Sequence, residues 1–250
     1  MNRPLTLSTI DGIRIAVRHD AGPRRLAFVV AHGFTGSSGT PGLRAVREVL
    51  RQYGGVIAVD MRGHGASGGE STLGDLEVHD VAAAVILARD LGYAQVVTVG
   101  FSMGASVVVR QAGTESAGID AVVSVSGPAF WYYRGTPAMR WVHLTIGSRI
   151  GREIARRARG TRIAATGWVP APEPPAEMAP RIAPTPFLIV HGDQDGYFPL
   201  EHADRLYAAA SQPVGARAEL WVEPGFGHAE SAISANLVHR IAGWAAAAVS

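Results

Sequence analysis

The segment Gly100-Phe101-Ser102-Met103-Gly104 constrains the fold more than any other part of the chain. The β-branched run over residues 95–99 predicts a buried strand, and residues 105–112 predict a helix directly after the segment. A serine at a strand-to-helix turn, with Gly two positions before and after it, is typical of a nucleophile elbow. Bulky side chains would collide at the flanking positions of so tight a turn, and Gly removes the collision. We therefore expect the Ser102 hydroxyl at the carboxyl edge of a sheet.

Strands and helices alternate along the remaining chain. A hairpin is predicted around Asp11-Gly12, and the other predicted strands and helices then follow in turn. The predicted strands are 5–9, 13–17, 26–31, 56–59, 121–125, 187–190 and 218–222, and the predicted helices are 43–52, 75–91, 200–210 and 229–248. This order predicts one α/β domain over residues 1–250, with a mostly parallel central sheet, helices on both faces and a site beyond the carboxyl ends of the strands.

The alternation breaks between residues 127 and 186. This stretch contains an aromatic cluster, an arginine-rich helix and then seven prolines, which are excluded from regular helix interiors and central strands. The prolines are Pro170, Pro172, Pro174, Pro175, Pro180, Pro184 and Pro186. We interpret the stretch as a helical cap or lid inserted over the edge of the sheet, with a stiff proline-rich return.

Charge is concentrated in this predicted cap. Every one of the 23 basic residues is an arginine, and eight of them lie between residues 127 and 164 against a single acid, Glu153. Helical spacing places Ile146, Ile150, Ile154 and Ala158 on one face, with Arg149, Arg152, Arg156 and Arg159 opposite. The simplest expectation packs the apolar face on the sheet domain and leaves the arginines in water. Docking to an anionic membrane surface and steering of an acidic substrate are the alternatives.

Composition excludes several kinds of site. The chain has no cysteine, so it has no thiol nucleophile, disulfide or cysteine-ligated metal, and without lysine it has no lysine-containing phosphate loop. We expect no metal, no organic cofactor and no nucleic-acid partner. The N-terminus lacks the apolar region of a signal peptide, and no stretch is long and apolar enough for a membrane span. A cytoplasmic location is the expectation.

A serine nucleophile needs a general base, and the base needs an orienting acid. His228 follows the last predicted strand in Pro224-Gly225-Phe226-Gly227-His228, on the edge predicted for Ser102. His191-Gly192-Asp193-Gln194-Asp195 follows the preceding strand and offers two acids, between which spacing alone does not choose. The order serine, acid, histidine is that of the α/β-hydrolases.

These motifs together resemble the α/β-hydrolase superfamily, in the serine-hydrolase branch that includes bacterial esterases and monoacylglycerol lipases. The resemblance covers nearly the whole chain outside residues 127–186. It implies that Asp195, in H-G-x-x-D, is the acid, and that the backbone N–H groups of Phe34 and Met103 form the oxyanion hole. It also implies that Arg62 and His64, in the segment Asp60–Gly65, shape the loop beside the site.

The resemblance is weak evidence for substrate. We expect a carboxylic-ester hydrolase of the esterase or monoacylglycerol-lipase type, which acts on a small-molecule acyl ester through Ser102, His228 and Asp195 and an acyl-enzyme intermediate. A thioesterase, amidase or C–C bond hydrolase with the same triad is the alternative, and a non-catalytic ligand-binding protein is the third hypothesis. The predicted cap contains four clustered aromatic residues, which are Trp131, Tyr132, Tyr133 and Trp141. These aromatics either line an acyl pocket or form the core of the cap.

Overall fold

The computed structural model describes residues 4–114 and 118–250. Its strands are β1 (Pro4–Ser8), β2 (Arg14–Asp20), β3 (Leu26–Ala31), β4 (Gly55–Val59), β5 (Gln95–Phe101), β6 (Ala121–Val125), β7 (Phe187–Gly192) and β8 (Ala218–Glu223). Its helices are α1 (Pro41–Leu50), α2 (Glu77–Asp90), α3 (Met103–Thr114), α4 (Pro137–Gly147), α5 (Arg149–Arg159), α6 (Pro175–Met178), the 3₁₀ helix η1 (Ala179–Ile182), α7 (Leu200–Ala210), α8 (Ala229–Ala232) and α9 (Ala235–Ala248).

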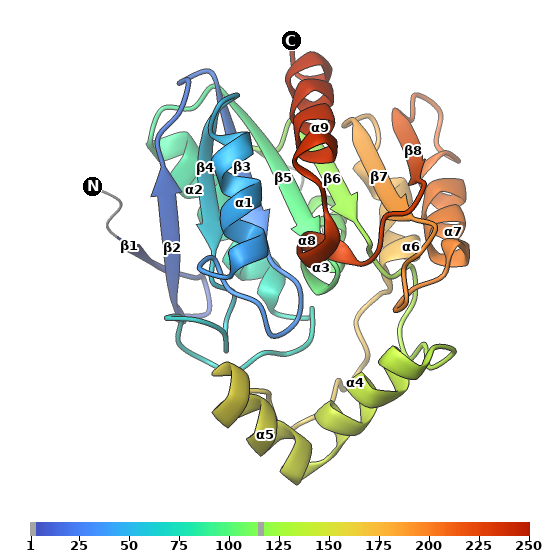
Figure 1. Ribbon diagram of the computed structural model, residues 1–250. Coiled ribbons are helices and arrows are strands. Elements are labelled where there is room, and N and C mark those ends of the chain that lie inside the picture. Colours follow the sequence, from blue (N-terminus) through green and yellow to red (C-terminus); the bar gives the residue numbers. More distant parts are fainter. Residues whose placement is uncertain (1–3, 115–117) are drawn as a thin grey trace.

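The strands form one twisted sheet in the order β1-β2-β4-β3-β5-β6-β7-β8. β1 and β2 pair antiparallel, β2 and β4 also pair antiparallel, and all other neighbours are parallel (Figure 1). β3 has β4 on one side and β5 on the other, so the direction in which the chain crosses over reverses there. Ligands of open α/β sheets bind outside the carboxyl ends of the strands at such a point. The predicted sheet and its N-terminal hairpin are confirmed.

Helices cover both faces of the sheet. α1 and α9 lie on one face, and α2, α3 and α7 lie on the other (Figure 1). Every residue of β3, β4 and β6 is buried, as expected for parallel strands that are covered on both sides. The two apolar cores hold the strand ends in fixed positions, which gives the loops at the carboxyl edge a rigid base.

Two predicted elements differ from the structure. The helix predicted over residues 229–248 is interrupted, because Ile233 and Ser234 are extended and the Ser234 hydroxyl accepts a hydrogen bond of 3.2 Å from the N–H of Leu237 at the start of α9. The proline-rich return is partly helical. Pro175 and Pro180 occupy the first turns of α6 and η1, where a helix does not need the missing N–H.

The apolar stripe of the arginine-rich helix is exposed, whereas the simplest expectation packs it on the sheet domain. α4 and α5 meet at Ser148 and project as a V beyond the carboxyl edge of the sheet (Figure 1). Ile150 is 76% exposed and Ile154 is 59% exposed, so the predicted packing of this stripe on the sheet domain is wrong. The physical reason is that α5 buries its small residue Ala155, while the chain that follows it is fastened by a parallel bridge between Ile163 and Ser71.

None of the helices in the described ranges combines the length and the apolar character that a membrane-crossing helix needs.

Candidate active site

The serine loop has the geometry of a strained elbow. β5 ends at Phe101, α3 begins at Met103, and Ser102 between them has a positive φ of 51°. A Cβ at Gly100 would overlap the carbonyl oxygen of Gly104, and a Cβ at Gly104 would overlap the carbonyl oxygen of Ala31 on β3. Both glycines are therefore required by close backbone approach, which is the steric reason predicted from the sequence.

We expect Gly104→Ala to destabilise the protein by at least about 3 kcal/mol, because the neighbour that its Cβ meets is backbone in a buried strand and has no room to move. Gly243→Ala is the matched control, since its Cβ meets nothing within 4 Å in the middle of α9. The control should gain up to about 1 kcal/mol from helix propensity. Denaturant unfolding measures both, and equal stability of the two variants would contradict the steric account.

The structure brings Ser102, His228 and Asp195 into one hydrogen-bonded chain. The Ser102 hydroxyl lies 2.9 Å from His228 Nε2 and donates to it. His228 Nδ1 lies 2.8 Å from Asp195 Oδ2, so its N–H donates to the carboxylate. The three side chains come from the loops after β5, β8 and β7, which end at the same edge of the sheet.

The two acids of the β7 loop have different partners. Asp195 Oδ1 accepts hydrogen bonds from the N–H groups of Tyr197 at 2.8 Å and Phe198 at 3.0 Å, and the Asp195 side chain is 1% exposed. Burial opposes ionisation of Asp195, but the hydrogen bond and charge of His228 together with these two N–H groups outweigh it and lower its pKa. Asp193 is exposed and accepts from the Gly225 N–H at 2.7 Å. Of these two acids, Asp195 is the one that contacts His228.

Two buried histidines support the loop that holds Asp195. His191 Nε2 donates to the Phe198 carbonyl oxygen at 2.8 Å and lies 3.6 Å from Asp195 Oδ2. His202 stacks on Phe130 with ring centroids 4.2 Å apart, and burial lowers its pKa to about 4. Both rings are completely buried.

The backbone N–H groups of Phe34 and Met103 face no competing acceptor. Phe34 follows the His32-Gly33 pair at the end of β3, and Met103 is the first residue of α3. Among the residues that the structure describes, neither N–H donates a hydrogen bond. The Met103 N–H also lies at a helix N-terminus, where the helix dipole favours negative charge. Their role as oxyanion donors stays a prediction.

Glu230 is a residue of this edge that the sequence analysis missed. Its Oε1 accepts a hydrogen bond of 2.9 Å from the Gly33 N–H, and its carboxylate would lie within about 3.3 Å of a Cβ at Gly33. It therefore ties the segment that carries Phe34 to the loop that carries His228. Its position two residues after His228 was the available signal.

The segment Asp60–Gly65 is packed as a support. Arg62 is almost fully buried and forms ion pairs of 2.7 Å with Asp11 and 2.8 Å with Asp80. His64 is also buried, and its ring lies 4.9 Å from that of His32, whose pKa burial lowers to about 3. These contacts hold the loop after β4 against the loop after β3. They agree with the structural role that the sequence analysis assigned to Arg62 and His64.

The cap aromatics divide into three environments. Trp131 and Tyr132 both contact the ring of Trp168, at 5.1 and 5.7 Å between centroids. Tyr133 packs edge-on against His202 at 4.6 Å, next to the support of Asp195. Trp141 is 71% exposed on α4 and joins neither group. Of the candidate pocket residues, the structure therefore brings Trp131 and Tyr132 together and leaves Trp141 apart.

Neither of the two cavities found on α5 includes Ser102, His228 or Asp195. No group of three or more His, Asp or Glu side chains within residues 4–114 and 118–250 is arranged to hold a metal ion.

Comparison with known proteins identifies the family. The family model described as serine aminopeptidase, S33, matches residues 22–166, which is more than half of the chain. The chain belongs to this family. The match spans β3 and the serine elbow, and the hydrogen-bonded partners Asp195 and His228 lie beyond it. The predicted α/β-hydrolase fold and serine-hydrolase class are thereby confirmed for this S33-family enzyme.

Solved structures agree with this assignment of the fold. The esterase Pf2001 of Pyrococcus furiosus aligns with a TM-score of 0.80 and 22% identity over 100% of this chain and 94% of its own. Est1E from Butyrivibrio proteoclasticus aligns with a TM-score of 0.65 and 21% identity over 98% and 99%. XC6422 from Xanthomonas campestris, described as an a/b serine hydrolase without lid, aligns with a TM-score of 0.64 and 18% identity over 99% and 93%. No curated protein sequence matches the chain.

Proposed function

We propose that this S33-family enzyme hydrolyses small-molecule carboxylic esters through an acyl-enzyme intermediate. The observation that carries the proposal is the continuous chain from the Ser102 hydroxyl through His228 to Asp195, with contacts of 2.9 and 2.8 Å. These are the distances that a nucleophile, its general base and the orienting acid need. One of its structural neighbours, Pf2001, is named an esterase, which supports ester over other acyl substrates.

In the proposed reaction the Ser102 oxygen attacks the acyl carbonyl carbon while His228 Nε2 takes the hydroxyl proton. Asp195 holds the imidazole with Nδ1–H toward its carboxylate and stabilises the imidazolium that forms. The Phe34 and Met103 N–H groups would donate to the oxyanion, a contribution of about 3 kcal/mol per donor in other enzymes. His228 then protonates the leaving alcohol. Water attacks the acyl-enzyme while His228 takes one of its protons, and as the second tetrahedral intermediate releases the carboxylic acid, His228 returns that proton to the Ser102 oxygen.

Two features of the site support a serine-centred mechanism for this chain. Tyr197 stacks on the His228 ring at 4.2 Å between centroids and restricts its rotation, while Asp195 fixes its tautomer. The His228 side chain is 15% exposed, so the ring is not sealed from substrate and water. No step of the proposed reaction needs a metal or an organic cofactor.

The test is turnover of a p-nitrophenyl ester series from acetate to palmitate, compared with matched thioester and anilide substrates. We expect ester turnover with an optimum at one chain length, and covalent labelling of Ser102 by a fluorophosphonate, located by peptide mass spectrometry. Faster turnover of the thioester or the anilide would replace the ester proposal with a thioesterase or an amidase. Absence of both turnover and labelling would contradict the proposed hydrolase activity.

A further inference from the structure

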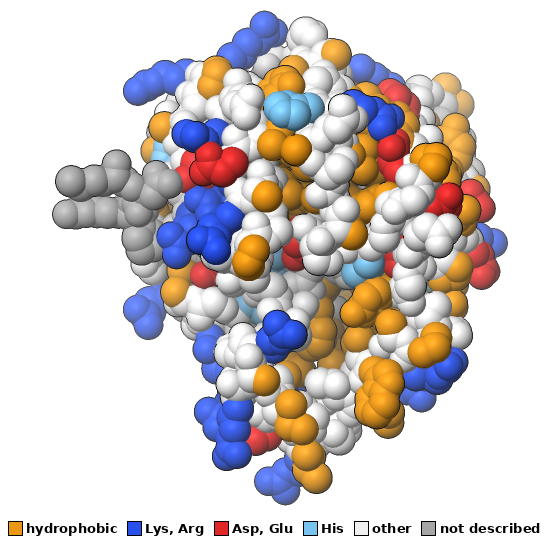
Figure 2. All heavy atoms as spheres, viewed as in Figure 1, with side chains coloured by type: hydrophobic (Ala, Val, Ile, Leu, Met, Phe, Trp, Pro, Cys, Tyr) orange, Lys and Arg blue, Asp and Glu red, His pale blue; other side chains and the backbone are white. Residues whose placement is uncertain are grey.

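The α4–α5 pair exposes large apolar side chains to solvent. Trp141 and Leu144, three residues apart on α4, are 71% and 61% exposed. Ile150 and Ile154, four residues apart on α5, are 76% and 59% exposed. Figure 2 shows hydrophobic side chains reaching the tip of this projection, with Arg side chains beside them. We call these four residues, together with Arg149 and Arg157 beside the two isoleucines, the α4–α5 face.

The helix α5 also carries an excess of positive charge. Arg149, Arg156, Arg157 and Arg159 are exposed on α5, and Glu153 is the one acid of that helix. Glu153 forms ion pairs of 2.6 Å with both Arg156 and Arg157, and hydrogen bonding from Arg156 lowers its pKa to about 2. One carboxylate therefore serves two guanidinium groups, and the helix keeps a large net positive charge.

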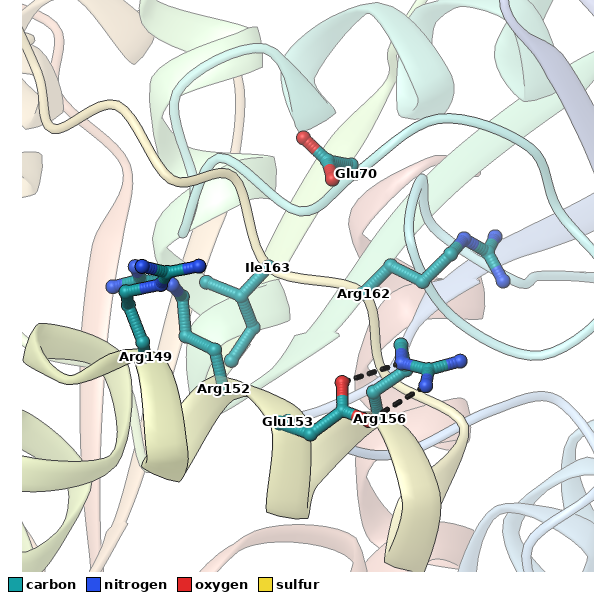
Figure 3. Close-up of a pocket in the computed structure, with 7 residues that line it drawn as sticks. All are labelled: Glu70, Arg149, Arg152, Glu153, Arg156, Arg162 and Ile163. Carbon is teal, nitrogen blue, oxygen red and sulfur yellow. Dashed lines mark hydrogen bonds and ion pairs between the residues drawn. The ribbon is translucent and has the colours of Figure 1, made fainter.

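Arginines also line a cavity of about 270 Å³ beside α5. Arg149 and Arg152 rise from α5 toward the loop that carries Glu70, with Arg162 and Ile163 on the chain that follows the helix (Figure 3). A second groove on the outer side contains Ile150, Ile154 and Arg157 together. In this second groove the cationic side chains of Arg149 and Arg157 thus lie beside the apolar side chains of Ile150 and Ile154.

We propose that the α4–α5 face binds the surface of a membrane that contains anionic lipids, with α5 lying in the headgroup layer. An exposed helix with Trp, Leu and Ile beside arginines matches both parts of such a surface, because the apolar side chains enter the acyl boundary and the arginines meet the anionic headgroups. A second copy of this chain would bring arginines against arginines, so like-charge repulsion disfavours a dimer through this face.

This inference stands apart from the proposed ester hydrolysis. None of Trp141, Leu144, Ile150 and Ile154 hydrogen-bonds to or stacks on Ser102, His228 or Asp195 among the described contacts. Membrane binding and ester turnover can therefore fail independently, and each has its own measurement.

The test is co-sedimentation of the intact protein with vesicles of phosphatidylcholine alone and of phosphatidylcholine mixed with phosphatidylglycerol. We expect binding to the mixed vesicles at low ionic strength, much weaker binding to phosphatidylcholine alone, and a loss of binding as salt screens the arginines. No binding of the wild type to the mixed vesicles at low salt would overturn the proposal.

Paired variants separate the apolar and the electrostatic parts. Ile150→Ser with Ile154→Ser should weaken partitioning by about tenfold or more, whereas Ile86→Ser, at a 62% exposed position on α2, should leave it unchanged. Arg157→Gln should weaken it by about fivefold. Arg51→Gln should not, although Arg51 pairs with Glu48 on α1 much as Arg157 pairs with Glu153.

Two results would overturn the proposal even if vesicles bind the wild type. The first is equal binding by the α4–α5 variants and their controls, with folding verified by unchanged thermal unfolding. The second is a dimer in light scattering that the paired isoleucine substitutions dissociate, since a second copy would then cover the face.

Discussion

Replacing Ser102 with alanine is expected to lower ester turnover by about a millionfold, to the residual rate that binding and oxyanion stabilisation provide. The reason is that the Ser102 oxygen is the atom to which the acyl group is transferred, and Ser102→Ala leaves His228 Nε2 without a hydroxyl to deprotonate. Initial rates with the preferred p-nitrophenyl ester measure the effect, and fluorophosphonate labelling should disappear in parallel.

Ser124→Ala is the control for this substitution. Ser124 lies opposite Gly100 on the neighbouring strand β6, and its hydroxyl is buried without a hydrogen-bond partner among the described residues. Removal of an unpaired hydroxyl should leave both stability and turnover close to those of the wild type. Turnover by Ser102→Ala within tenfold of the wild type would exclude Ser102 as the nucleophile.

Replacing Asp195 with asparagine is expected to lower kcat by about ten-thousandfold. The Oδ1 atom of Asp195 accepts the Tyr197 and Phe198 N–H groups, so asparagine keeps its oxygen there and turns its NH₂ group toward His228 Nδ1. His228 then carries its proton on Nε2, where it is unable to accept one from Ser102. The fold should survive, because Asp195→Asn changes no side-chain volume in the buried site.

Asp193→Asn is the matched control for Asp195→Asn. Asp193 lies two residues away in the same loop, and among the residues that the structure describes it accepts only the Gly225 N–H, which an asparagine oxygen also accepts. We expect wild-type kcat from this variant. If kcat falls in Asp193→Asn while Asp195→Asn keeps it, the assignment of the orienting acid is wrong.

Much of the fold and the candidate triad could be predicted because the signals are local. The glycines that flank Ser102 are required by contacts within one turn and its neighbouring strand, and they can be recognised in the sequence as a pattern. The carboxyl ends of parallel strands meet at one edge, so the positions of Ser102 and His228 followed from the order of elements alone. The choice of Asp195 over Asp193 needed the family resemblance, and the structure then placed only Asp195 against His228.

Other features depend on partners that are distant in the sequence. The helix interruption at Ser234 lies in a run with no proline, where the sequence indicates one continuous helix. Glu230 accepts a hydrogen bond from the Gly33 N–H across 197 positions of the chain, so its place two residues after His228 does not by itself reveal this contact. From the sequence alone His202 is expected at the surface of a helix, whereas in the structure Phe130 and Tyr133 pack against its ring.

The sequence by itself determined the α/β alternation, the strained serine turn and the amphipathic, arginine-rich character of α5. These features depend on backbone sterics and on side-chain periodicity, which are properties of the local sequence and do not need distant contacts. Only the tertiary structure decided which side of α5 faces outward, because that depends on what the helix rests on. Here the small side chain of Ala155 and the bridge between Ile163 and Ser71 set the contact, and Ile150 and Ile154 are left at the surface.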